Sequence, residues 1–73
     1  MATFEERLIA LRTAAGVSQQ TIGDMLGVTR WSVHNYEVGK NRPDFDGLLA
    51  LADYFDVSLD YLVGRSDRRE VAR

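Results

Sequence analysis

The chain contains no cysteine, one histidine and one proline among its 73 residues. Without cysteine it can form neither a disulfide framework nor a thiolate zinc site, and the single histidine, His34, cannot assemble a metal centre by itself. We therefore expect no metal and no cofactor. The packing of side chains has to supply the stability of the fold.

Long hydrophobic runs are also missing. No apolar stretch approaches the roughly 18 residues of a membrane span. No basic segment leads into an apolar stretch near the N-terminus, so a secretory signal is not expected either. These observations predict a soluble, cytoplasmic protein without a membrane partner.

The sequence offers no constellation of residues for catalysis. It has no paired carboxylates in a plausible cleft, no glycine-rich phosphate loop, and no nucleophile beside an activating histidine. Ser32 and His34 are two residues apart on one predicted helix, so their side chains point in very different directions. We predict that the protein is not an enzyme.

Composition indicates one small globular unit. Hydrophobic residues make up 45% of the chain and charged residues 27%, which is usual for a folded domain. We assign residues 1–64 to a single domain and residues 65–73 to a polar C-terminal tail. The core of so short a chain contributes only about 3–5 kcal/mol, which makes association with a second copy favourable.

The net charge of −2 hides an uneven distribution of charge along the chain. Residues 43–64 contain five aspartates and no basic residue, whereas residues 12–42 carry a net charge of +2. Exposed charges act over about 8–10 Å at physiological salt. The basic middle segment can therefore bind a phosphate backbone while the acidic segment faces elsewhere.

Short segments of helical periodicity alternate with capping signals. The first segment opens with Thr3 and Glu6, whose spacing matches a capping box, and ends at Gly16. Four further helices follow possible N-cap residues, namely Ser18, Thr29, Asp44 and Ser58. No strand-like alternation is present. The sequence predicts an all-α fold with helices over residues 4–15, 19–26, 30–38, 45–55 and 59–63.

Two of these helices carry an apolar stripe that should face the core. In the first helix we expect the stripe to consist of Phe4, Leu8, Leu11 and Ala15. In the fourth helix we expect it to consist of Phe45, Leu48, Leu51, Ala52 and Phe55.

The second and third helices are separated only by Gly27, Val28 and Thr29, which is typical of a helix-turn-helix unit. Four side chains of the third helix fall within an arc of about 140°, opposite Val33 and Tyr36. These four are Arg30, Trp31, His34 and Asn35. Arginine can pair with guanine, asparagine with adenine, and tryptophan can contact a thymine methyl or a sugar. The same face is also compatible with a surface that only contacts solvent.

An ordered set of short motifs resembles the phage-repressor-like (Cro/lambda-repressor, or XRE-type) helix-turn-helix DNA-binding family. The resemblance extends from Leu8 to Gly64. Its components are Leu11-Arg12, Gly16-Val17-Ser18-Gln19, Ile22, Leu26-Gly27-Val28-Thr29, Val33, Tyr36-Glu37-Val38-Gly39-Lys40, Arg42-Pro43, Leu48, Leu51-Ala52 and Val57-Ser58-Leu59-Asp60-Tyr61-Leu62-Val63-Gly64.

The resemblance implies a compact five-helix lambda-repressor-like domain and assigns roles to particular residues. It implies that the bases are read by Arg30, Trp31 and Asn35. It implies that phosphates are contacted by Gln19, Ser32, Lys40, Asn41 and Arg42. It also implies a structural ion pair between Arg12 and Glu37. Gln19 could instead be a plain first-turn residue, and the residues after the third helix a solvated loop.

The sequence departs from the family pattern at three positions. Gly23 stands where a small residue, usually alanine, lets the second and third helices approach each other. Asp56 stands where glycine or asparagine is common, and we predict a positive φ there. Trp31 is unusually large for a position that faces the bases.

We therefore expect a sequence-specific transcriptional regulator, acting as a repressor, that binds double-stranded DNA at a two-fold symmetric operator. It should act as a homodimer, without a small-molecule effector. The expected dimer surface comprises Leu59, Tyr61, Leu62 and Val63, although Leu59 and Leu62 could instead close the core of the monomer. The alternative function is that of a helical protein-interaction adaptor that does not bind DNA itself.

Overall fold

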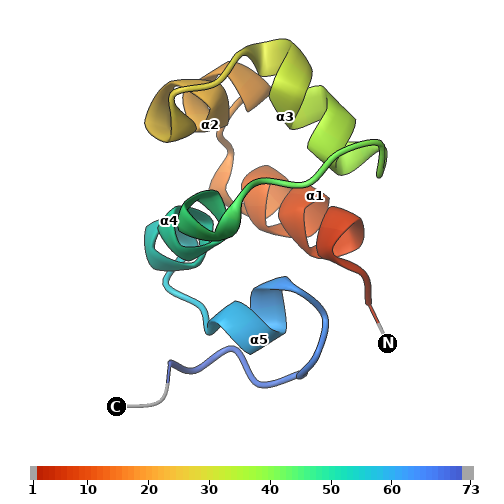
Figure 1. The fold of residues 1–73 in the computed structure, drawn as a ribbon. Helices are drawn as coiled ribbons and strands as arrows, with labels where there is room; N and C mark the ends of the chain where they lie inside the picture. The colour runs from red at the N-terminus through yellow and green to blue at the C-terminus, as the bar shows by residue number, and fades with distance from the viewer. Residues whose placement is uncertain (1, 72–73) are drawn as a thin grey trace.

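The computed structural model describes residues 2–71, and five helices occur among them (Figure 1). They are α1 (Phe4–Ala15), α2 (Gln19–Leu26), α3 (Arg30–Glu37), α4 (Phe45–Phe55) and α5 (Leu59–Leu62). No strand occurs among these residues, so the predicted all-α class is confirmed. The predicted helices α3 and α5 each end one residue earlier than expected, because Val38 and Val63 have left the helical conformation.

Each helix begins directly after the expected N-cap residue. The side chains of Thr3, Ser18, Thr29, Asp44 and Ser58 all accept a hydrogen bond from a backbone N–H in the first turn. At the start of α1 the capping box is complete, and the hydrogen bond from the Thr3 backbone N–H lowers the pKa of the Glu6 carboxyl. Asp56 ends α4 with a φ of 53°, which confirms the predicted left-handed residue.

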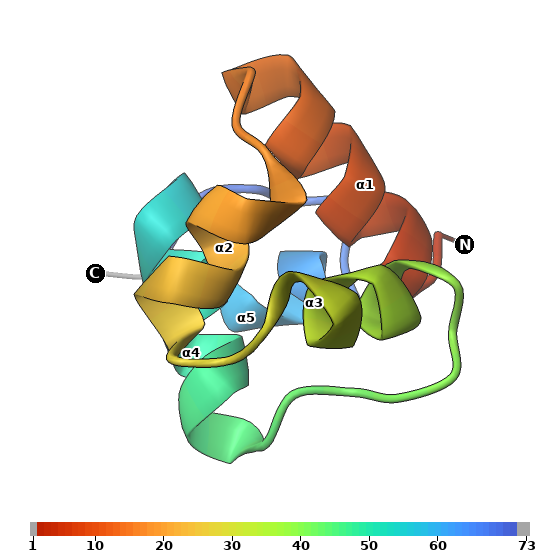
Figure 2. The ribbon, with the colours of Figure 1, turned by 90° about the horizontal axis from the view of Figure 1, so that it is seen from above.

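Helices α2 and α3 form one end of the molecule, and α5 lies at the other end (Figure 1). Seen from the α3 end, α2 and α3 lie in front of α5 (Figure 2). Every helix contributes one aliphatic side chain that is fully buried, and these five are Leu8, Ile22, Val33, Leu51 and Leu62. None of the helices in residues 2–71 is long and apolar enough to cross a membrane.

In α1 and α4 the buried face is shorter than the apolar stripe that the sequence predicts. Phe4, Leu8 and Leu11 are buried in α1, but Ala15 at its last position is exposed. In α4, Phe45 is 65% exposed and so does not belong to the core. The cause is the same in both helices. Neighbouring helices cover only part of each helix, whereas the apolar periodicity of the sequence continues to the last turn.

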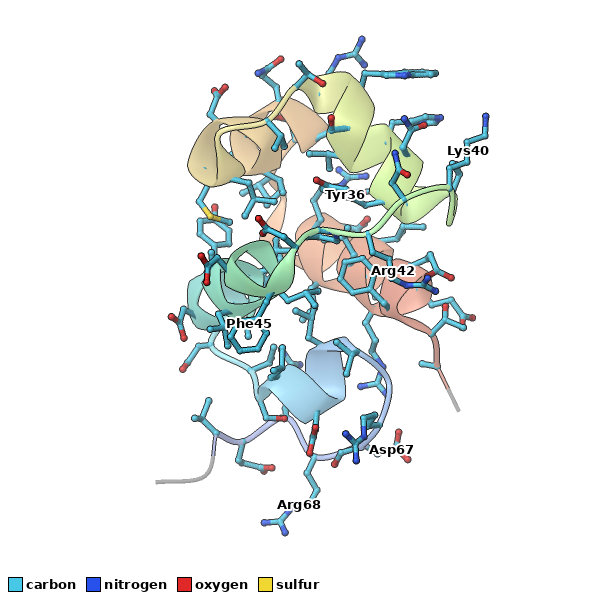
Figure 3. The ribbon with its side chains drawn as sticks, viewed as in Figure 1. Tyr36, Lys40, Arg42, Phe45, Asp67 and Arg68 are labelled. Atoms are coloured by element: carbon cyan, nitrogen blue, oxygen red, sulfur yellow. The ribbon has the colours of Figure 1, made fainter. Side chains whose placement is uncertain are left out.

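The C-terminal segment does not extend α5 as a helix. It turns back along α5, where the backbone N–H of Ser58 donates to the carbonyl of Arg69 at 2.8 Å. Asp67 accepts a hydrogen bond from Nη2 of the buried Arg7 at 2.8 Å, and the Arg7 guanidinium lies 3.7 Å from the ring centre of Tyr61. Figure 3 shows Asp67 and Arg68 beside α5, at the opposite end from Lys40.

The start of the chain packs tightly against Gly64. A Cβ atom at Gly64 would lie 2.1 Å from the carbonyl oxygen of Ala2, and Gly64 has a φ of 84°. Gly16 has a similar φ of 70°, but a Cβ there would meet nothing within 4 Å. Both glycines therefore have the left-handed conformation, but only Gly64 lies close to another residue, Ala2.

We predict that Gly64→Ala lowers the free energy of unfolding substantially more than Gly16→Ala does. Both substitutions strain the left-handed backbone by about 1–2 kcal/mol, and only Gly64→Ala also forces the N-terminal segment away from α5. Urea denaturation followed by circular dichroism measures the difference. Equal losses in the two variants would show that the contact with Ala2 contributes nothing to stability.

Candidate nucleic-acid interface

The turn between α2 and α3 is held close to α2 by a glycine. A Cβ atom at Gly23 would lie 2.9 Å from the carbonyl oxygen of Val28 and 3.3 Å from the backbone nitrogen of Arg30. Alanine at this position would require the backbone to shift in this chain. Ile22 from α2 and Val33 from α3 are both fully buried beneath this turn. The two helices therefore pack closely against each other.

Helix α3 has a buried face and an exposed face, as its sequence predicts. Val33 and Tyr36 belong to the core. Arg30 is exposed, and Trp31 is 64% exposed although it is a large aromatic residue. The rings of Trp31 and His34 are stacked, with 5.1 Å between their centres and 20° between their planes.

Asn35 lies on this helix with its side chain partly buried. Its Oδ1 atom is buried and has no hydrogen-bond partner among the residues that the structure describes. A bidentate contact with adenine requires this oxygen as an acceptor. Asn35 must therefore rotate its amide outward before it can read a base in the predicted way.

The carboxylate of Glu37, the last residue of α3, joins α3 to α1 and α2 through hydrogen bonds. Arg12 of α1 donates from Nε to Oε2 at 2.5 Å and from Nη2 to Oε1 at 3.1 Å. Gln19 of α2 donates from Nε2 to Oε1 at 2.9 Å. The hydrogen bonds to Glu37 raise the pKa of Arg12 above its usual value. The geometry contains the expected pairing of Arg12 with Glu37.

Gln19 is consequently less available for phosphate than the sequence suggests. Its amide nitrogen is already used by Glu37, and its side chain is partly buried. The amide oxygen of Gln19 and the backbone N–H groups of Gln19 and Gln20 are the groups left for a ligand, because the N–H of Thr21 donates to the Ser18 side chain. Sequence reasoning missed the bond between Gln19 and Glu37, because the two residues are 18 positions apart and no local pattern connects them.

The residues after α3 that are predicted to contact phosphate differ in whether their side chains already have a partner. Lys40 and Asn41 are exposed, and their backbone N–H groups both donate to the carbonyl of Asn35, at 2.9 and 3.3 Å. Arg42 donates from Nη2 to Oε1 of Glu5 at 3.2 Å. Figure 3 shows Lys40 at the α3 end, whereas Arg42 lies nearer α1.

Ser32 has a partner within its own helix turn. Its hydroxyl shares a hydrogen bond of 3.1 Å with the hydroxyl of Thr29, and its backbone N–H donates to the same Thr29 oxygen. Its main contact is therefore with the cap of α3. A phosphate would compete with Thr29 for the Ser32 hydroxyl.

A protein-family model described as helix-turn-helix matches residues 8–62 of the chain. The chain belongs to the helix-turn-helix family. The prophage-derived regulator YonR of Bacillus subtilis, named as an uncharacterized HTH-type transcriptional regulator, is 45% identical over 60 residues, which cover 82% of this chain and 56% of YonR. The chain spans little more than half the length of YonR and of two further curated regulators of Bacillus subtilis that it matches.

Two solved structures are similar to this helix-turn-helix chain. A transcriptional regulator from Listeria innocua has a TM-score of 0.83 and 37% identity, over 85% of this chain and 58% of the regulator. The P22 c2 repressor, crystallised in complex with a synthetic operator, has a TM-score of 0.81 and 29% identity. That match covers 90% of this chain and 100% of the P22 chain. The expected lambda-repressor-like fold is thus confirmed.

The helix-turn-helix unit and the expected dimer residues lie at different ends of the molecule (Figure 1). Leu62 is fully buried, so it cannot form part of a surface, and its assignment to a dimer interface was wrong. Leu59, Tyr61 and Val63 are partly buried. Tyr61 is also covered on its ring faces by Arg7 and Arg69, whose guanidinium carbons lie 3.7 and 5.6 Å from the ring centre.

We predict that Glu37→Gln lowers the free energy of unfolding by about 2–3 kcal/mol, because it leaves the Arg12 guanidinium without its charged partner. The Glu37 side chain is only 6% exposed. The matched control is Glu5→Gln, which removes the exposed pair with Arg42 and should cost less than about 1 kcal/mol. Urea denaturation measures both losses. A Glu37→Gln variant as stable as Glu5→Gln would contradict a structural role for this cluster.

Proposed function

We propose that the protein is a transcriptional regulator that binds double-stranded DNA through the major groove with α3. The observation that carries this proposal is the exposed pair of Arg30 and Trp31 on a helix whose opposite face is fixed in the core. The fold of the P22 c2 repressor, which was crystallised with an operator, supports the same function. An α-helix with its side chains is about 10–12 Å in diameter and fits a groove about 12 Å wide.

Base reading would use three side chains of α3. The exposed guanidinium of Arg30 can donate two parallel hydrogen bonds to guanine. Trp31 offers an apolar surface, and Asn35 can pair with adenine once its amide has turned outward. Each well-formed bidentate pair discriminates against a wrong base by about 1–3 kcal/mol.

Phosphate contacts would supply affinity and position. Lys40 and Asn41 are exposed beside α3 and can reach the backbone directly. Arg42 would exchange Glu5 for a phosphate, which is inexpensive because the Arg42 side chain is 67% exposed in this pair. Gln19 and Ser32 would add weaker polar contacts from the first turns of α2 and α3.

The acidic part of the chain favours one orientation of the protein on DNA. The five aspartates between residues 43 and 64 lie on or beside α4 and α5, and these two helices lie below α2 and α3 in Figure 1. Repulsion from phosphate would turn these helices outward, while Arg30 and Lys40 attract the backbone. The protein would work where the DNA is, which agrees with a cytoplasmic location.

The finer part of the proposal is a homodimer that acts as a repressor on a two-fold symmetric operator. One α3 reads only a few base pairs, so two copies placed about 34 Å apart would give useful specificity. The exposed parts of Leu59, Tyr61 and Val63 remain the proposed contact, without Leu62. Residues 1–64 would form the DNA-binding domain, and the following segment its C-terminal tail. No small-molecule effector is proposed.

Selection of binding sites from random duplex DNA tests the function directly. We expect an enriched sequence with two-fold symmetry, and affinity that falls with salt with a log–log slope of about −0.9 per phosphate contacted. Absence of any binding at low salt would contradict DNA binding and favour the adaptor function. An enriched site without symmetry would contradict the homodimer alone.

Two charge-matched variants test where the DNA lies. Lys40→Ala should weaken binding to all duplexes and flatten the salt slope by about one unit. Arg68→Ala removes the same charge at the opposite end of the molecule and should leave the slope unchanged (Figure 3). Fluorescence anisotropy at several salt concentrations measures both. Equal effects would mean that the protein does not bind through the α3 end.

Asn35→Ala tests base reading separately from phosphate binding. We expect it to relax the preference at one position of each half-site, at a cost of about 1–3 kcal/mol for the matched base only. Selection repeated with the variant measures the preference. An unchanged base preference would show that Asn35 does not read a base.

A further inference from the structure

Residues 65–71 leave α5 and run back along it, and we call this segment the strap (Figure 1). The backbone N–H groups of its first two residues donate to the carbonyl of Asp60 at 2.8 and 3.2 Å. Ser58, the N-cap of α5, is bonded to the strap twice. Its backbone N–H donates to the carbonyl of Arg69 at 2.8 Å, and its hydroxyl donates to the carbonyl of Arg68 at 3.0 Å. The strap is therefore bonded to α5 at several points.

Side chains make a second set of contacts, which centres on Tyr61 of α5. The guanidinium of Arg69 in the strap lies 5.6 Å from the ring centre, and the guanidinium of Arg7 in α1 lies 3.7 Å from it. Arg7 also donates to the carboxylate of Asp67 in the strap at 2.8 Å. The Arg7 side chain is 10% exposed and the Asp67 side chain 87% exposed. A molecule that packs on Tyr61 from outside would therefore displace the strap and leave Arg7 in place.

The partly buried side chain of Leu59 also lies beside the strap. A groove runs between α5 and the strap, and Leu59 lines it together with four residues of the strap, namely Ser66, Arg68, Glu70 and Val71. Leu59 and Tyr61 are two of the three residues that we propose as the contact with a second copy. A second copy packed on these two side chains would occupy the space in which the strap now lies.

The strap is held by contacts that water can replace. Apart from Ser66, which is partly buried, its residues are exposed, and Val71, its one aliphatic residue, is 41% exposed. Hydrogen bonds and ion pairs at a surface contribute little net free energy, because water takes the place of a lost partner. Release of the strap would leave the core in place, since Leu62 anchors α5 and is fully buried.

A second copy can cover Leu59 and Tyr61 with apolar surface, which the strap does not supply, and burial of apolar area is the main driving force of association. We propose that the strap competes with a second copy for the surface formed by Leu59 and Tyr61, so that the homodimer forms only when the strap is released. The inference rests on the proposed function, because it takes α5 as the contact between the two copies.

This competition makes dimer formation depend on DNA. A duplex that holds two copies side by side raises the effective concentration of one copy at the other. Release of the strap is therefore most favourable on a duplex with two half-sites. On a duplex with one half-site, and in dilute solution, the strap should stay on α5.

One pair of charge-matched variants tests the ion pair of the strap. Asp67→Asn removes the carboxylate that binds Arg7, whereas Glu70→Gln removes the same charge from a residue that makes no hydrogen bond or ion pair within residues 2–71. Analytical ultracentrifugation, with the protein alone and on a duplex with two half-sites, measures how tightly two copies associate. We expect association up to about fivefold tighter in Asp67→Asn, the effect of one ion pair with an exposed partner. Glu70→Gln should associate like the unaltered chain.

A second pair leaves Arg7 and Asp67 untouched, so it decides the question even if Asp67→Asn does not fold. Arg69→Ala removes the guanidinium beside Tyr61. Arg68→Ala removes the same charge from the neighbouring residue, whose bond to Ser58 is made by its backbone carbonyl and is kept. Only Arg69→Ala should associate more tightly than the unaltered chain.

Amide chemical shifts of the strap, recorded by NMR, show whether it is released. They should move toward the values of a disordered chain as the dimer forms. A dimer in which the strap keeps its monomer shifts would overturn the inference. It would also be overturned if Asp67→Asn associated no more tightly than Glu70→Gln, and Arg69→Ala no more tightly than Arg68→Ala. In these cases the dimer and DNA binding remain, and only this inference fails. A protein that stays monomeric even on two half-sites would contradict the homodimer of the proposed function as well.

Discussion

The buried carboxylate of Glu37 determines how α3 is mounted on the rest of the molecule. It accepts hydrogen bonds from Arg12 of α1 and Gln19 of α2, and Arg12 also donates to the carbonyl of Val17 between these helices at 3.0 Å. A buried carboxylate is costly unless its oxygens are satisfied, so this arrangement tolerates little displacement. These hydrogen bonds therefore set the orientation of the exposed face of α3.

Stability and recognition are assigned to opposite faces of the same helix. Val33 and Tyr36 anchor α3 in the core, whereas Arg30 and Trp31 contribute little to packing because they are exposed. The residues that would read DNA can therefore vary while the fold stays the same. Function in such a scaffold depends on the site and cannot be taken from the fold alone.

The sequence predicts helix ends well because their signals are local. Thr3 and Glu6 are three residues apart, and Asp56 needs only its own backbone preference. The exposure of Phe45 and the burial of Leu62 depend instead on where neighbouring helices end, which no periodicity encodes. The same limit applies to the site. The arc of α3 could be predicted from its period, but the bonds that join Gln19 to Glu37 and Arg42 to Glu5 span 18 and 37 residues and arise from tertiary packing.

The central claim is that DNA binds at the end of the molecule formed by α2, α3 and the loop after α3. Backbone amide chemical shifts, recorded by NMR as duplex DNA with one half-site is added, test it most directly because they report every helix at once. The account predicts large changes at Gln19, from residue 30 to residue 35 and from residue 40 to residue 42, with little change along α5. Changes concentrated on α4 and α5, with α3 unaffected, would contradict it.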